Sequence, residues 1–92
     1  MSENAAFLMF YTADCEHCEA MLPVINELLQ ENDIEFELVE VTPDDKATIA
    51  RYDSYEQGNC GGVPFFVHTE TKRWLCGEVS KDELRTWALA QQ

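Results

Sequence analysis

Basic side chains are scarce in this sequence of 92 residues. Six Lys and Arg residues stand against eighteen Asp and Glu residues, which gives a formal net charge of −12 at pH 7. A surface of that sign repels phosphate groups, so we expect neither nucleic acid nor an anionic membrane as a partner. Neutral and basic partners remain compatible with this charge.

Targeting and membrane-spanning features are also missing. The N-terminus has no cationic region and no small-residue cleavage site, the marks of a secretory signal peptide. The apolar run at residues 6–11 is far shorter than the roughly 20 residues that a membrane-spanning helix needs. We therefore expect a cytoplasmic protein, although a chain whose signal peptide had been removed would have the same sequence.

Cysteine is too sparse for a scaffold held together by disulfides. The sequence has four cysteines, at positions 15, 18, 60 and 76, whereas small secreted proteins that depend on disulfides have more. The hydrophobic share of 46% instead indicates a folded chain with its own core. We expect a single domain covering residues 1–92. In a reducing compartment, such thiols are more often catalytic or metal-binding than structural.

Two of the cysteines lie where an apolar run gives way to a helical pattern. Residues 6–11 are typical of a buried strand, and apolar residues then recur at spacings of three and four from Cys18 to about residue 32. If Cys15 opens that helix, its sulfur lies beside unpaired backbone N–H groups, which favour the thiolate. Cys18 follows one turn later, close enough to form a disulfide with Cys15. The pair predicts dithiol–disulfide exchange.

The rest of the chain alternates between strand and helix signals. Thr-Pro-Asp-Asp at residues 42–45 has the form of a helix start, with Thr42 as the cap and proline at the first position. The predicted elements are a strand at 36–42, a helix from there to about Tyr55, a glycine-containing loop at 57–62, strands at 63–68 and 73–77, and a final helix capped by Ser80. The predicted order is β-α-β-α-β-β-α.

Four features make this sequence resemble the thioredoxin superfamily. They are a Cys-x-x-Cys motif directly after an apolar strand, Pro23 five residues beyond that motif, Val63-Pro64 at the start of the third strand, and Gly77 followed by a capped helix. The resemblance covers nearly the whole chain and is to proteins of glutaredoxin size. It implies a thioredoxin-like α/β fold in which three helices flank a four-stranded mixed sheet.

The resemblance also implies a thiol–disulfide oxidoreductase. Cys15 would be the attacking thiol and Cys18 the resolving one. Val63-Pro64 would be a cis peptide bond facing them, where the Val63 backbone can pair with an extended substrate. With Gly77, these residues would bind the substrate.

Protein disulfides are the expected substrates, rather than glutathione. Thr12 stands where glutaredoxins carry a basic residue that holds a glutathione carboxylate, and the negative net charge further disfavours that anionic tripeptide. An unidentified reductase or a low-molecular-weight thiol would supply electrons. We expect a monomer without a cofactor.

The motif itself departs from the family. Residues 14–18 read Asp-Cys-Glu-His-Cys instead of the usual thioredoxin or glutaredoxin sequence. Protonated His17 would favour the thiolate, whereas Asp14 and Glu16 would oppose it, so the direction of electron flow stays open. Met9 stands where thioredoxins carry a buried acid. Proton transfer would therefore need another group, with His17 as the nearest candidate.

Cys60 and Cys76 have no counterpart in this resemblance, although the expected topology places them at the same end of the molecule as Cys15 and Cys18. They could be an incidental loop thiol and a small buried strand residue. They could also form a second redox pair or a relay to the first. With all four thiolates, they could hold zinc or an iron–sulfur cluster, making the chain a metal-binding module. A redox-inert adaptor that binds a peptide beside Val63-Pro64 is a further alternative.

Overall fold

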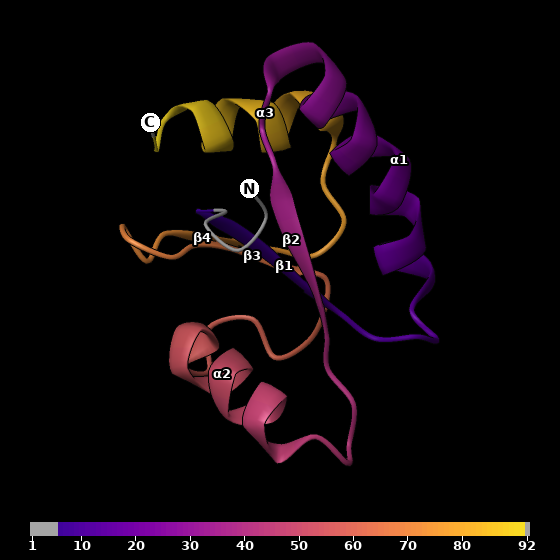
Figure 1. Ribbon diagram of the computed structural model, residues 1–92, viewed down its shortest axis with the longest axis vertical. Coiled ribbons are helices and arrows are strands. Elements are labelled where there is room, and N and C mark those ends of the chain that lie inside the picture. The colour runs from indigo at the N-terminus through magenta and orange to yellow at the C-terminus, as the bar shows by residue number, and fades with distance from the viewer. Residues whose placement is uncertain (1–5, 92) are drawn as a thin grey trace.

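The computed structural model of the protein describes residues 6–91. In this part of the chain, a four-stranded sheet is flanked by three helices (Figure 1). The elements are β1 (Phe7–Tyr11), α1 (Glu16–Asn32), β2 (Phe36–Glu40), α2 (Lys46–Glu56), β3 (Phe65–His68), β4 (Trp74–Cys76) and α3 (Lys81–Leu89). Their order and type confirm the predicted thioredoxin-like α/β fold. None of the helices within 6–91 is long and apolar enough to span a membrane.

The apolar strand β1 lies inside the sheet, whose strand order is β2-β1-β3-β4. It runs parallel to β2 and antiparallel to β3, while β4 runs antiparallel to β3. Four of its five residues are buried, because neighbouring strands cover both of its edges and helices cover both of its faces. This burial explains why β1 shows no alternation of polar and apolar residues.

The sheet separates two cores, because successive residues of a strand point to opposite faces. Helices α1 and α3 cover one face, and α2 covers the other (Figure 1). Met9, Phe66 and Leu84 belong to the core beneath α1 and α3. Phe10 and Phe65 belong to the core beneath α2. Neighbouring residues of β1 and of β3 therefore contribute to different cores.

The prediction that Thr42 caps α2 is wrong, because Asp45 takes that position. The Asp45 carboxylate accepts hydrogen bonds from the backbone N–H of Thr48 at 3.1 Å and from its hydroxyl at 2.6 Å. Residues 42–45 instead form a turn, in which the Asp45 N–H donates to the Thr42 carbonyl at 3.2 Å. The turn brings the carboxylate to the unpaired N–H groups of the helix start, where a short acidic side chain is a strong cap.

The C-terminal helix begins where the sequence predicts. Ser80 caps α3, and its hydroxyl accepts a hydrogen bond from the backbone N–H of Glu83 at 3.1 Å. The strands before it are shorter than predicted. β3 starts at Phe65 because Pro64 has no N–H to donate to the ladder, and β4 ends at Cys76. Residues 63, 64 and 77 thus lie just outside the strands.

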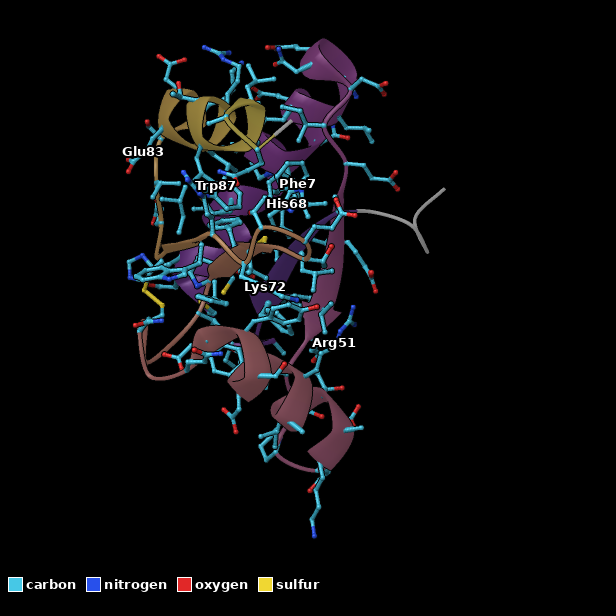
Figure 2. All side chains as sticks on the ribbon, turned by 90° about the vertical axis from the view of Figure 1, so that its left-hand side faces the viewer. Phe7, Arg51, His68, Lys72, Glu83 and Trp87 are labelled. Atoms are coloured by element: carbon cyan, nitrogen blue, oxygen red, sulfur yellow. A yellow bond between two sulfur atoms is a disulfide. The ribbon has the colours of Figure 1, made fainter. Side chains whose placement is uncertain are left out.

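His68 is a buried polar residue at the end of β3, and it packs beside Phe7 (Figure 2). Its Nδ1 atom accepts hydrogen bonds from the backbone N–H groups of Glu70 and Thr71, both at 3.1 Å. These bonds satisfy the ring nitrogen and hold the turn between β3 and β4.

Candidate dithiol active site

Cys15 is the N-cap residue of α1, directly after the loop that leaves β1. Its side chain is half-buried, and its sulfur accepts a hydrogen bond from the backbone N–H of Cys18 at 3.1 Å. The sulfur therefore occupies the positive end of the helix dipole and satisfies one of the N–H groups that lack an intrahelical partner. Both effects stabilise negative charge on this sulfur. The predicted position of Cys15 at the helix start is confirmed.

Cys18 is buried beneath the first turn of α1, with 2% of its surface exposed. Burial raises the pKa of its thiol to about 11, and the hydrogen bond with the Cys15 side chain acts in the same direction. Cys18 is therefore a neutral thiol at pH 7. The structure holds both cysteines as free thiols, one reachable from solvent and one enclosed.

The backbone of Val63 contacts the Cys15 sulfur. The Cys15 thiol donates to the Val63 carbonyl, with 3.8 Å between sulfur and oxygen. The Val63–Pro64 peptide bond is cis, as the resemblance implies. Pro64 is fully buried, and its carbonyl accepts the backbone N–H of Gly77 at 2.8 Å. The structure thus brings Val63, Pro64 and Gly77 together beside Cys15, with Pro64 below the surface.

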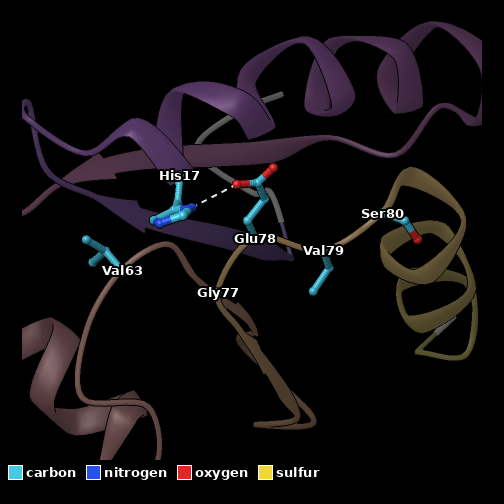
Figure 3. A pocket seen from close by; sticks show the side chains of 6 residues that line it. All are labelled: His17, Val63, Gly77, Glu78, Val79 and Ser80. Atoms are coloured by element: carbon cyan, nitrogen blue, oxygen red, sulfur yellow. Dashed lines mark hydrogen bonds and ion pairs between the residues drawn. The ribbon is translucent and has the colours of Figure 1, made fainter.

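A surface cleft of about 540 Å³ lies beside Val63 (Figure 3). Its lining comes from the first turn of α1, the residue before the cis peptide bond, and the segment between β4 and α3. The lining residues are His17, Val63, Gly77, Glu78, Val79 and Ser80. Two of the three predicted substrate-binding residues, Val63 and Gly77, therefore face this cleft.

Glu78 is a residue of this cleft that the sequence interpretation missed. Its Oε1 atom lies 2.8 Å from the Nδ1 atom of His17, so that the pair joins α1 to the segment after β4 (Figure 3). The signal available in the sequence is its position directly after Gly77, which the resemblance already places near the site. His17 thus bonds to a carboxylate and to neither thiol, which removes the geometric support for it as the proton carrier of Cys18.

Asp14 and Glu16 flank Cys15 in the chain, and both are exposed. Within residues 6–91, neither forms an ion pair with Lys or Arg. Both charges therefore face solvent, on residues that adjoin Cys15 in the chain. Their predicted influence on Cys15 stays a prediction.

Cys60 and Cys76 form a disulfide between residues 16 positions apart, visible as the yellow bond in Figure 2. The interpretation of an incidental loop thiol and a buried strand residue is therefore wrong: the two are bonded, and Cys76 is exposed. The four-cysteine metal site is not formed either, since two of its sulfurs are joined to each other. No group of three or more candidate metal ligands exists among residues 6–91.

The two cysteine pairs lie on opposite sides of the sheet. Cys15 packs against the core beneath α1 and α3, whereas Cys60 packs against the core beneath α2. Cys76 is the partner of Phe65 in the ladder between β3 and β4, so both side chains lie on the α2 face. This arrangement gives no support to a direct relay of electrons between the pairs.

Glu56 holds the loop that carries Cys60, and nothing in the sequence singled it out. It is 5% exposed, and its carboxylate accepts the backbone N–H groups of Gly58 at 2.6 Å, Cys60 at 2.6 Å and Gly61 at 2.5 Å. The hydrogen bonds from Gly61 and Gly58 lower the pKa of this carboxyl. The loop is thereby fixed in the form that places Cys60 against the end of β4.

Comparison with known proteins identifies one family. Residues 1–67 match the model of the TraF family, described as F plasmid transfer operon protein. The match includes Cys15, Cys18 and the Val63–Pro64 bond, and ends before Cys76 and Gly77. No curated protein matches the chain. Since the matched region is well over half of the chain, the protein belongs to the TraF family.

Proposed function

We propose that the protein is a thiol–disulfide oxidoreductase of the thioredoxin superfamily, acting on protein disulfides through Cys15 and Cys18. The observation that carries this proposal is the half-buried Cys15 sulfur at the N-terminus of α1, hydrogen-bonded to the Cys18 N–H at 3.1 Å. The thioredoxin-like topology and the membership of the TraF family are compatible with it. A thiolate in such a place is both stabilised and reachable.

The reaction consists of two exchanges. The Cys15 thiolate attacks one sulfur of the target disulfide, forms a mixed disulfide and releases the other target sulfur as a thiolate. The Cys18 thiol then loses its proton and attacks the Cys15 sulfur. This step forms the Cys15–Cys18 disulfide and releases the target in its reduced form, after two electrons have left the protein. A reductase or a low-molecular-weight thiol would restore the dithiol.

The substrate segment lies beside the Val63 carbonyl. This carbonyl is next to the Cys15 sulfur, so a backbone N–H of an extended substrate can pair with it while the target sulfur meets Cys15. Gly77 offers backbone without a side chain on the other side, and Pro64 supports both from beneath. The protein would act as a monomer and without a cofactor.

The cellular location stays a prediction. A cytoplasmic protein was expected, but the Cys60–Cys76 disulfide weighs against a reducing compartment, where such bonds rarely persist. An oxidising compartment would allow the same chemistry with the direction of electron flow set by the potential of the Cys15–Cys18 pair.

The test is insulin reduction with dithiothreitol as the electron donor. Cys15→Ser should abolish the activity, because no attacking sulfur remains. Cys18→Ser should retain the first attack and accumulate mixed disulfides with the substrate, detected by mass spectrometry under non-reducing conditions. A variant with both Cys60→Ser and Cys76→Ser is the matched control and should retain activity at temperatures where it is folded. Full activity of Cys15→Ser would overturn the proposal and favour a redox-inert adaptor.

A further inference from the structure

The cleft beside Val63, whose carbonyl contacts the Cys15 sulfur, combines aliphatic side chains with a negative charge. Val63 and Val79 contribute aliphatic surface to the lining, and Glu78 contributes a carboxylate. Asp14 and Glu16 add two exposed carboxylates on the two sides of Cys15 in the chain. A substrate segment that reaches the Cys15 sulfur therefore enters a negative field.

Basic side chains of the protein do not neutralise that field. None of the six Lys and Arg residues lines the cleft, and four of them are engaged elsewhere. These are Arg51 with Glu37, Lys72 over the Tyr55 ring, Lys81 with Glu27 and Glu31, and Arg85 with Asp82. The nearest basic group in the lining is the His17 ring, which is already hydrogen-bonded to Glu78.

We propose that this cleft selects a partner protein in which a Lys or Arg residue lies within a few positions of the target cysteine. The inference rests on the proposed function and names its substrate class. In the free protein, Glu78 is bonded to His17. On binding, the substrate cation replaces the His17 ring at Glu78, and its aliphatic stem packs against Val63 and Val79. Arginine fits best, because its guanidinium can bind a carboxylate through two parallel hydrogen bonds.

A substrate cation can replace the His17 ring at Glu78, because both side chains of this pair are accessible to solvent. The exposed fraction is 71% for the His17 side chain and 47% for the Glu78 side chain. A pair this exposed is weakly held in water, so a substrate cation displaces the ring at little cost. Glu78 thereby acts as a specificity-determining residue that contacts substrate without taking part in sulfur chemistry.

The experiment compares three synthetic peptides that share one disulfide and differ only in the residue beside the target cysteine, which is Arg, Gln or Glu. The measured quantity is kcat/KM for reduction at low ionic strength. We expect roughly tenfold faster reduction of the Arg peptide than of the Glu peptide, with the Gln peptide between them, because complementary charge mainly accelerates association. This ratio should shrink toward one at about 0.5 M salt, where charges are strongly screened.

Glu78→Gln should lower the ratio of the Arg peptide to the Glu peptide several-fold. Glu70→Gln is the matched control: it removes the same charge from an exposed position in the turn after β3, and should leave the ratio intact. Equal rates for the three peptides, or an unchanged ratio in Glu78→Gln, would overturn the inference. If the same protein still reduces insulin, the proposed function is unaffected by that result. Failure to reduce both insulin and all peptides would overturn the two together.

Discussion

Removal of the Cys60–Cys76 disulfide by Cys60→Ala and Cys76→Ala should lower the free energy of unfolding by about 3 kcal/mol. The bond closes a loop between residues 16 positions apart, and a cross-link of that span restricts the unfolded chain by this amount at 25 °C. A domain of this size is typically stable by roughly 5–15 kcal/mol. The loss is therefore a large share of the total and corresponds to a fall in melting temperature of roughly 12–24 °C.

The measurement is urea unfolding followed by circular dichroism, with and without dithiothreitol. The wild-type protein should lose about 3 kcal/mol when the bond is reduced, whereas the double alanine variant should not respond to the reductant. A variant with Cys15→Ser and Cys18→Ser is the matched control, because it removes the two free thiols and keeps the loop closed. It should respond to dithiothreitol as the wild type does.

The result that would refute this reasoning is a reduced wild-type protein with undiminished stability. Thiol counting must first show that dithiothreitol has opened the bond. If the urea midpoint and slope then stay unchanged, the loop that carries Cys60 between α2 and β3 is held by its other contacts. The hydrogen bonds from Gly58, Cys60 and Gly61 to Glu56 would be the foremost of these.

Two further predictions follow from the titrating groups. Burial raises the pKa of Cys18 to about 11. Below that value, the rate at which Cys18 releases the substrate from Cys15 should rise about tenfold per pH unit, because the thiolate fraction of Cys18 rises by that factor. The decay rate of the mixed disulfide in a single turnover measures this dependence, and a rate that levels off near neutral pH would contradict the prediction. Hydrogen bonds lower the pKa of Glu56 below its usual value of 4.5, so its stabilisation is present above that value and lost as pH falls through the folded pKa. Glu56→Gln should therefore destabilise the protein at pH 7, and the variant should lose less stability than the wild type when the pH is lowered. Urea unfolding of both proteins at pH 7 and at acid pH measures this difference. An identical pH dependence of stability in the variant and the wild type would disprove the role of Glu56.

The order of elements was predictable because most of its signals are local. An uninterrupted apolar run marked β1, and spacings of three and four marked α1. Ser80 and Glu83 marked the start of α3, where their hydrogen bond is found. The start of α2 was misplaced because Thr42 and Asp45 are both good caps. Only the turn at residues 42–45 decides which of them meets the helix.

The positions of Cys15 and Cys18 in the fold were also predictable, since they depend on one junction between neighbouring elements. The composition of the surrounding site was not. His17 and Glu78 are 61 positions apart, and their contact arises only when the segment after β4 packs beside α1. Glu56 acts through backbone N–H groups of a loop, which have no signature in the side-chain sequence.

Short-range features of this protein follow from residue order alone, because backbone sterics, helix capping and the period of apolar residues act over a few positions. These features placed a thiol at a helix start after a buried strand. The pairing of Cys60 with Cys76, the separation of the two cysteine pairs by the sheet and the contact of His17 with Glu78 in the cleft depend on tertiary packing. That packing brings together residues far apart in the chain, and no local preference specifies which of them will meet.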